Sequence, residues 1–392
     1  MASKTMAMVG AGGAVFSLAA WLFYYSAFAG VRGEDGMVFY SAVRAALDGK
    51  LDLIYDGAHL TADLNARFVG FLAHPLPLHP WLYPPHFLVL LLPFGFLPPV
   101  LAALAFLATS FALMAAALCA LAHNPREKLL YVLSALLCPA SAIVVWLGQN
   151  TFLTAGLLVG GFAFGQKRPV LGGVLLGALT YKPQFWLMVP VALIAARQWK
   201  MLAWALASAT ALMLASLALF GPGLWMDWLH VMIAPSAMFD QWQALARLNG
   251  QSLYACARIL GAGQSLANGV QYAGIALAGV AVWRARALPT DLKIAVLLAA
   301  TIFAAPHIID YDAVLLGLAA TIFFAHILRH EPKPHYGDVA IAALLWLSPL
   351  VNPPSVFVMG MATPILTVLF VLRVLARADT QIHGAPLIAQ PA

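Results

Sequence analysis

The sequence predicts an all-α integral membrane protein, a bundle of about 12 transmembrane segments. Hydrophobic residues make up 63% of the 392 residues and charged residues only 9%, with a mean hydropathy of +0.88. Soluble domains carry about 25% charged residues, so the composition excludes a soluble protein. The apolar runs have the length of bilayer-spanning helices, whereas the strands of a membrane barrel alternate in shorter segments.

The basic residues predict the orientation of the chain in the membrane. The net charge is +6 and the pI about 9.3, but the basic residues stand in short clusters between apolar runs, such as Lys167/Arg168 and Arg373/Arg377. This is the positive-inside pattern, so these loops are predicted to be cytoplasmic. The basic pI therefore reflects topology, and no nucleic-acid partner is expected.

The chain begins with a predicted transmembrane helix over residues 6–30. Its apolar stretch is longer than the apolar region of a signal peptide, about 7–15 residues, so the helix is predicted to be retained. Residues 31–82 form the predicted first extracytoplasmic loop. Within it, residues 37–47 repeat apolar side chains at helical spacing beside a polar face, which is typical of an amphipathic helix lying on the membrane surface.

Prolines divide residues 84–122 into a short apolar piece and a longer helix. The later basic clusters share one side of the membrane if this stretch makes one net crossing, with the short piece re-entrant. A full crossing by both pieces would place at least one basic cluster outside. The further predicted segments are 129–147, 151–165, 170–181, 184–196, 201–220, 253–283, 290–305, 312–328, 337–350 and 355–373.

All of these segments are assigned to one polytopic domain over residues 1–378. The polar residues 379–392 are predicted to be a disordered cytoplasmic tail.

The first loop is the acidic part of the chain. It holds six of the 15 acidic residues, namely Glu34, Asp35, Asp48, Asp52, Asp56 and Asp63. Asp35 lies just past the first membrane segment, where a carboxylate stays ionised yet faces a lipid-borne substrate. This placement indicates chemistry at the membrane surface rather than a passive pore.

Other polar residues are predicted to lie on the same exterior face. Ionisable residues at membrane depth are costly and are functional candidates by default. Lys182 ends an apolar helix before Pro183, where an ammonium suits a phosphate partner or snorkels to the interface. His307 follows Pro306 and either donates to phosphate and exchanges protons or caps a helix end.

Uncharged side chains add hydrogen-bonding capacity to that face. Gln149 and Asn150 suit sugar hydroxyls but also an ordinary helix turn. Tyr83 precedes two prolines that fix the entry of a helix, and it is a candidate to face the site. Asp310 and Asp312 are a weak metal signal, and at least one is expected to cap the next segment.

The motifs follow one another in a defined order. They are Glu34-Asp35-Gly36-Met37-Val38-Phe39-Tyr40, Leu47-Asp48-Gly49, Ile54-Tyr55, Tyr83-Pro84-Pro85, Gly148-Gln149-Asn150, Lys182-Pro183-Gln184, Asn249-Gly250-Gln251-Ser252 and Pro306-His307 with Tyr311-Asp312. Over roughly residues 10–375 this set resembles the polytopic GT-C glycosyltransferases, specifically glycosyltransferase family 87. Members of that family include bacterial mannosyltransferases that use polyprenyl-phosphate-mannose.

The resemblance implies a GT-C-like fold and assigns roles to individual residues. Asp35 matches the general base of the first exterior loop; Glu34 is the alternative carboxylate, and the frame of the motif favours Asp35. Lys182 and His307 match positions near the lipid phosphate of the donor. The implied substrate-binding residues are Glu34, Tyr83, Gln149, Asn150, Gln184, Asn249 and Asp312.

The expected activity is inverting transfer of a sugar, mannose foremost, from a polyprenyl-phosphate donor to a glycolipid or glycan hydroxyl. No cofactor is expected, and the need for a divalent metal is left open; three scattered cysteines support no zinc site. There is no phosphate-binding G-x-x-x-x-G-K-[ST] loop for a nucleotide donor. The expected location is the bacterial cytoplasmic (inner) membrane, in contact with its lipids, with the site facing the periplasm.

Two other functions compete with this one. A transporter or flippase would use Lys182, His307 and Asp312 as a substrate or ion path, but should place its charges near the bilayer midplane, commonly in repeated halves. A structural membrane subunit leaves the exterior polar clustering unexplained.

Overall fold

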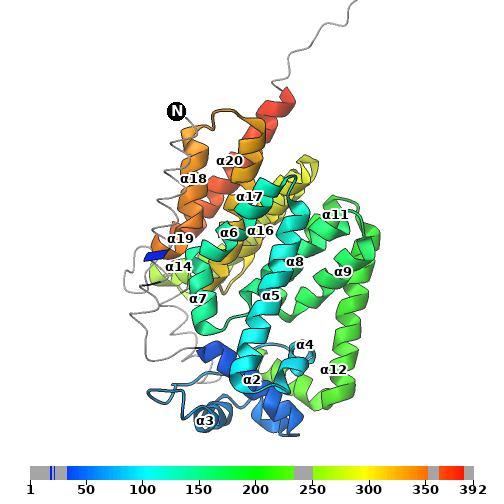
Figure 1. The fold of residues 1–392 in the computed structure, drawn as a ribbon, viewed down its shortest axis with the longest axis vertical. Coiled ribbons are helices and arrows are strands. Elements are labelled where there is room, and N and C mark those ends of the chain that lie inside the picture. The colour runs from blue at the N-terminus through cyan, green and yellow to red at the C-terminus, as the bar shows by residue number, and fades with distance from the viewer. Residues whose placement is uncertain (1–17, 20–21, 23–32, 234–249, 352–361, 384–392) are drawn as a thin grey trace, which may run out of the picture.

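The computed structural model describes residues 18–19, 22, 33–233, 250–351 and 362–383, and within these ranges every regular element is a helix (Figure 1). The elements are α2 (Glu34–Leu47), η1 (Leu51–Leu53), α3 (Gly57–Arg67), α4 (His86–Gly95), α5 (Pro99–Leu121), α6 (Pro125–Leu137), α7 (Pro139–Leu147), α8 (Thr151–Gly165), α9 (Pro169–Ala178), η2 (Leu179–Tyr181), α10 (Pro183–Trp186), α11 (Met188–Ala195), α12 (Trp199–Ile233), α14 (Leu253–Ile259), α15 (Gln264–Arg284), η3 (Ala285–Ala287), α16 (Thr290–Ala304), η4 (Asp310–Ala313), α17 (Val314–His330), α18 (Tyr336–Trp346), α19 (Ser348–Val351) and α20 (Ala362–His383).

Some predicted features fall outside the described residues. Almost all of the predicted first helix over 6–30, Asn249, and residues 384–392 of the predicted tail are among them. Helix α20 runs to His383, so residues 379–383, assigned from sequence to a disordered tail, are helical.

Within the described residues, four helical stretches are long and apolar enough to cross a membrane: Pro99–Leu121, Trp199–Ile233, Gln264–Ala287 and Asp310–His330. Helices α6 and α7, bent by 56° at their junction, make a fifth if they form one span. Several predicted segments instead correspond to apolar helices of 10–17 residues, α8 among them. The described part of the chain thus confirms a helical protein with several apolar spans, and it does not confirm a total of about 12.

Proline and glycine account for the breaks that shorten these helices. Cys138–Pro139 separates α6 from α7 because a proline cannot continue the hydrogen bonding of the preceding helix. The predicted segment 201–220 ends where Gly221, with φ of 77°, interrupts α12, but the helix resumes after Pro222. That predicted terminus is therefore a kink.

Helix α2 packs against protein on its apolar side. Met37, Val38, Phe39, Ala42 and Val43 are buried, and the helix contacts α3, α4 and α5. The apolar stripe that predicted a membrane-surface helix is therefore covered by protein side chains.

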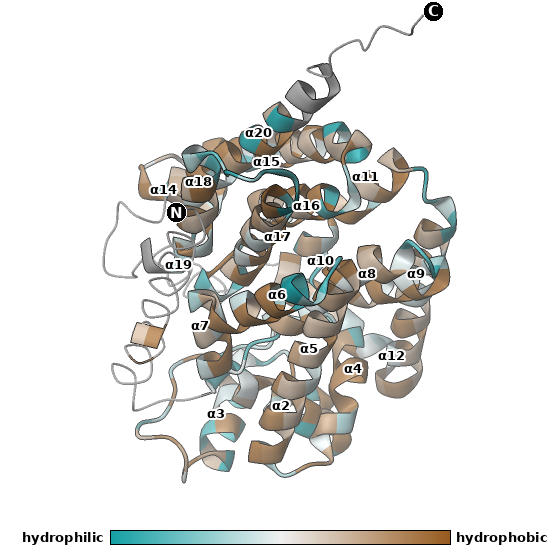
Figure 2. Cartoon of the chain, turned by 45° about the horizontal axis from the view of Figure 1, so that its top comes forward, coloured by the Kyte–Doolittle hydropathy of each residue, from teal (hydrophilic) through white to brown (hydrophobic). Residues whose placement is uncertain are grey.

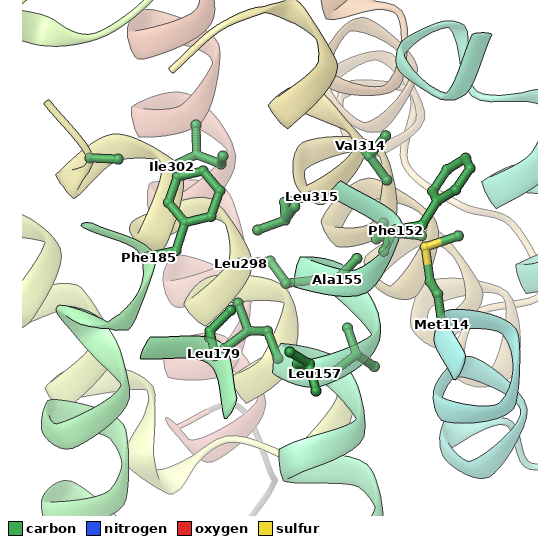
Figure 3. Close-up of a cluster of buried hydrophobic side chains, with 14 of the residues drawn as sticks. Met114, Phe152, Ala155, Leu157, Leu179, Phe185, Leu298, Ile302, Val314 and Leu315 are labelled. Atoms are coloured by element: carbon green, nitrogen blue, oxygen red, sulfur yellow. The ribbon is translucent and has the colours of Figure 1, made fainter. Parts of the chain in front are cut away.

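The centre of the bundle is a buried apolar cluster between α5, α8, α10, α16 and α17 (Figure 3). Its members include five residues of 0% exposure, namely Met114, Ala155, Phe185, Leu298 and Leu315. Close helix contacts depend on small residues, as is common in membranes. A Cβ on Gly172 of α9 would lie 2.5 Å from the Gly161 carbonyl oxygen of α8, so these two helices meet backbone to backbone.

The basic helix ends gather in one region through ion pairs. Arg329, at the end of α17, pairs with Glu127 of α6 and Asp291 of α16, and His326 lies 2.8 Å from the same Asp291 carboxylate. Figure 2 shows the hydrophilic start of α6 and the hydrophilic turn between α8 and α9. The predicted cytoplasmic clusters of these loops thus share one end of the bundle.

Candidate active site

The start of α2 is held against the turn between α7 and α8. The Gly33 amide donates to the Trp146 carbonyl oxygen at 2.8 Å. Gly148 adopts φ of +70°, which glycine tolerates best, and a Cβ there would lie 3.0 Å from Gly36 Cα. This backbone contact brings Asp35, at the first turn of α2, close to Gln149.

Asp35 is the carboxylate at the centre of this junction. Burial raises its pKa to about 6, while His79, a hydrogen bond from Gln149 and the charge of Lys182 oppose the rise. A carboxylate with a pKa this near neutrality remains ionised at pH 7 yet binds a proton more readily than an ordinary aspartate. These are the properties of a general base.

Glu34 has a different neighbourhood. Its carboxylate lies 3.0 Å from His79 Nε2. Burial opposes protonation of this histidine, but the hydrogen bond to Glu34 raises its pKa overall. Of the two carboxylates, Glu34 makes the direct contact with His79, and Asp35 is influenced by the charge of the same histidine.

Asn150 is positioned at the start of α8. It is fully buried, and its backbone carbonyl oxygen accepts from Thr154 and from the Tyr181 hydroxyl. Neither the nitrogen nor the oxygen of its side-chain amide is hydrogen-bonded in the described structure, although the Tyr83 hydroxyl is a close neighbour. A buried amide without partners is costly, so this amide is available to a ligand with hydroxyl groups.

Lys182 makes a buried ion pair. Its Nζ lies 3.1 Å from Asp312 Oδ1, and both side chains are buried, at 4% and 6% exposure. The ammonium also lies 5.0 Å from the Phe185 ring centroid and 5.6 Å from that of Tyr311. Lys182 therefore does not snorkel to the interface; it is a desolvated cation inside the protein.

Asp312 has two further partners that hold it in place. Its Oδ1 accepts from the Thr151 hydroxyl at 3.4 Å, and its Oδ2 accepts from the Ile309 amide at 3.4 Å. The second contact caps η4, as expected for at least one of Asp310 and Asp312. Asp312 thus acts directly on Lys182 in this structure.

His307 lies in the loop between α16 and η4. Its ring packs edge-on against Tyr254, with 6.4 Å between centroids, and burial lowers its pKa. The ring is therefore neutral at pH 7, so it offers a hydrogen bond to a phosphate rather than a charge. In the same region the Gln251 amide donates to Asp310, and Thr363 donates to Gln251 at 2.8 Å.

The structure brings together most of the residues predicted from sequence. Asp35, Tyr83, Gln149, Asn150, Lys182 and Asp312 belong to one connected cluster. Gln184 is partly buried in α10, directly after Lys182, and Asn249 lies outside the described residues.

Sequence reasoning missed His79 and Tyr181, and it gave no role to Tyr311, which stands in the Tyr311-Asp312 motif. Tyr181 adjoins the Lys182-Pro183-Gln184 motif, and that adjacency was the available signal. His79 is one of two histidines in a proline-rich stretch, with His74, and no pattern marks it. Within the described ranges, no three histidine, cysteine or acidic residues gather closely enough to hold a metal ion.

The site and the clustered basic end of the bundle lie at opposite ends of the same helices. Helix α8 begins beside Asn150 and ends beside Lys167, and α17 begins beside Asp312 and ends at Arg329. At 1.5 Å per residue, their 15 and 17 residues separate the two ends by about 22–25 Å.

Comparison with known proteins gives one match. The model of glycosyltransferase family 87 matches residues 81–306, more than half of the chain, and this stretch includes Tyr83, Gln149, Asn150 and Lys182. Asp35 and Asp312 lie outside it. No curated protein and no solved structure matches the chain. Because the family model covers most of the helical bundle, the chain belongs to glycosyltransferase family 87.

Proposed function

We propose that this glycosyltransferase moves a sugar, mannose foremost, from a polyprenyl-phosphate donor to a hydroxyl of a glycolipid or glycan acceptor. The observation that carries the proposal is Asp35, a carboxylate of raised pKa in a cluster that also holds a buried cation and an unsatisfied amide. The family supports glycosyl transfer. The roles of the residues are inferred from this cluster, whereas the polyprenyl-phosphate donor and mannose are what the sequence resemblance implies.

The reaction is a single displacement. Asp35 accepts the proton of the acceptor hydroxyl as its oxygen attacks C1 of the sugar. The bond between C1 and the phosphate oxygen breaks, the electron pair stays on the phosphate, and polyprenyl phosphate leaves. One displacement inverts the anomeric centre, so a β-linked donor gives an α-linked product, and no second catalytic carboxylate is needed.

Lys182 supplies positive charge for the departing phosphate. An ammonium has three N–H donors, and one contact with Asp312 leaves others for phosphate oxygens. In a buried site such a charge stabilises the developing anion more than it would in water. His307, as a neutral donor, and the amides of Gln149 and Asn150 complete the proposed contacts to phosphate and sugar; Glu34, Tyr83, Gln184 and Asn249 remain proposed substrate contacts.

The positions of the two ends of the bundle support the membrane face that we propose for the site. The site lies opposite the clustered basic loops, which the positive-inside rule places in the cytoplasm. This arrangement supports a site at the periplasmic face of the bacterial inner membrane. It also argues against a transporter function, because a transporter needs its charged residues near the midplane of the bilayer.

The test is transfer of label by purified protein in nanodiscs. We expect radiolabel from polyprenyl-phosphate-mannose to appear in a new product when a total lipid extract of the source organism is supplied. Other labelled lipid-phosphate sugars serve as parallel donors. Donor binding without transfer from any of them, or no donor binding at all, would contradict the proposal.

A further inference from the structure

An exposed apolar turn follows α3 in the first loop. The six residues between Arg67 and His74 all lack polar side chains, namely Phe68, Val69, Gly70, Phe71, Leu72 and Ala73. Val69 is 76% exposed and Phe71 is 58% exposed. A contiguous apolar patch on a protein surface marks a contact with another molecule or with a membrane.

The turn is ordered by contacts within itself. The amides of Phe71 and Leu72 both donate to the Phe68 carbonyl oxygen, at 2.8 and 3.1 Å. The Phe71 ring packs edge-on against the Phe68 ring, with 6.1 Å between centroids, and Phe68 is buried. These two amides are thus hydrogen-bonded within the turn, as an environment without water requires.

Helix α3 changes from polar to apolar along its length. At its start, the exposed side chains of Asp56 and His59 form a pair at 2.7 Å, and at its end stands the apolar turn. The 11 residues of the helix separate these ends by about 16 Å. Such a gradient along the axis indicates a helix that points from water toward the hydrocarbon, with its last turn deepest.

The apolar turn lies beside the first turns of α5. Phe71 borders the same cavity as Val100 and Leu104 of α5, and these two side chains are also exposed. Figure 1 shows α3 and the start of α5 at the same end of the bundle. Because α5 is a candidate membrane span, its exposed apolar side chains contact lipid tails.

The length of α5 gives the depth of this contact. Its 23 residues extend about 35 Å, whereas the hydrocarbon core of a bilayer is about 30 Å thick. Val100 and Leu104, in the first two turns, therefore lie near one edge of the hydrocarbon. The neighbouring Phe71 lies at a similar depth.

The turn is also connected to α2, the helix that carries Asp35. The Phe68 ring packs against the Tyr40 ring, with 5.9 Å between centroids. The Tyr40 hydroxyl donates to the Leu97 carbonyl oxygen at 3.0 Å, just before α5 begins. The apolar turn, α2 and the start of α5 are therefore held together.

We propose that Val69 and Phe71 insert into the leaflet nearest the candidate site and thereby anchor the first loop at the membrane surface. The occupant of this apolar surface is bilayer lipid, because the surface continues onto the exposed apolar side of a candidate span. The apolar stripe of α2 predicted such a contact but is covered by protein, so the turn after α3 provides it instead. This proposal goes beyond the proposed function and does not depend on the donor, the sugar or the base.

The experiment measures the surroundings of a nitroxide spin label on each end of α3. Val69→Cys and Ala58→Cys are labelled separately in a Cys119→Ala background, and the full chain is placed in nanodiscs. Both positions are exposed, and Ala58 lies at the polar start of the helix. Relaxation by oxygen, which concentrates in lipid, is compared with relaxation by a nickel chelate, which stays in water. We expect oxygen to dominate at Val69 and the nickel chelate to dominate at Ala58.

A matched pair of substitutions tests what holds the turn in place. A charged side chain is costly at membrane depth, so Phe71→Asp should shift the label at Val69 toward the nickel chelate. Phe71→Leu keeps an apolar side chain and should leave the label in lipid. Phe71 is exposed, so neither substitution opens a cavity in the buried core.

Three results would overturn the proposal. Dominance of the nickel chelate at Val69 would place the turn in water. Low accessibility to both reagents would mean that protein covers it, either another part of this chain or a second copy. An unchanged ratio in Phe71→Asp would show that lipid contact does not hold the turn.

Discussion

At the scale of single residues, the site contains two close pairs of oppositely charged groups and one further carboxylate, that of Asp35. Glu34 pairs with His79 and Lys182 with Asp312. Asp35 is buried, accepts a hydrogen bond from Gln149 and lies near the charges of His79, Glu34 and Lys182. Sequence could identify Glu34, Lys182 and Asp312 as candidate polar residues of the exterior face, but it did not identify His79. It could not pair them, because 130 residues separate Lys182 from Asp312 and no spacing rule connects them.

Substitutions in the Lys182–Asp312 pair should affect the stability of the protein and its binding of the donor differently. Lys182→Met leaves the Asp312 carboxylate buried and unpaired, so we expect unfolding to become easier by about 3–5 kcal/mol. Lys182→Met/Asp312→Asn should recover much of that loss, because no charge then remains to be buried. Thermal unfolding midpoints in detergent measure both variants.

Activity should not recover together with stability. Both variants should bind the polyprenyl-phosphate donor weakly, because both lack the ammonium. Equal destabilisation by the single and double substitutions, or normal donor binding without Lys182, would contradict the assigned role of this pair.

At the scale of elements, the apolar segments were predictable because local rules decide them. The predicted segment 151–165 coincides with α8. Pro98 and Pro99 separate α4 from α5 as expected, whereas Pro93 lies inside α4. The packing partners of a helix were harder to predict. The apolar stripe on α2 predicted an apolar face, but it did not indicate that α4 and α5 cover that face. Contacts between residues far apart in the sequence decide which helices pack together, and the spacing of apolar residues along one helix carries no information about those contacts.

The contact between α2 and the α7–α8 turn should control the rate of transfer. Gly148→Ala adds a Cβ 3.0 Å from Gly36 Cα, so α2 must move and carry Asp35 with it. A displacement of about 1 Å at a catalytic group can cost about 10²-fold in rate, and we expect a loss of kcat/KM of that order. Steady-state transfer assays measure it.

Gly49→Ala is the matched control for that substitution. Gly49 has a similar φ of +72°, but a Cβ there meets nothing within 4 Å. It should therefore incur the same backbone cost without moving Asp35 and keep its kcat/KM. Equal losses in the two variants would show that backbone strain, and not the position of α2, sets the rate.

At the scale of the whole molecule, helices with one polar end in the site and the other in a basic network give the protein two chemically different faces. Positive-inside clusters predicted this separation from sequence, and the ion pairs of Glu127, Asp291 and Arg329 place several of them together. The total number of spans could not be predicted, because short apolar helices and broken spans have the same local composition.

Cysteine labelling tests the orientation of these faces. In a Cys119→Ala background, Ala58→Cys on α3 should react with a membrane-impermeant maleimide in intact spheroplasts, because α3 adjoins His79 of the site. Lys167→Cys at the basic end should react only in inside-out vesicles. Both positions are exposed, so accessibility is set by the membrane alone. The reverse pattern would place the site in the cytoplasm.

The central claim, that Asp35 is the base, is tested most directly by the pH dependence of kcat/KM in three proteins. Burial raises the pKa of Asp35 to about 6, and only the ionised carboxylate accepts a proton, so wild-type kcat/KM should fall about tenfold per pH unit below that value. Glu34→Gln should keep this acid limb. Asp35→Asn should lack it, bind donor normally, and transfer about 10²–10⁴-fold more slowly. An unchanged acid limb in Asp35→Asn, or its loss in Glu34→Gln alone, would contradict the claim.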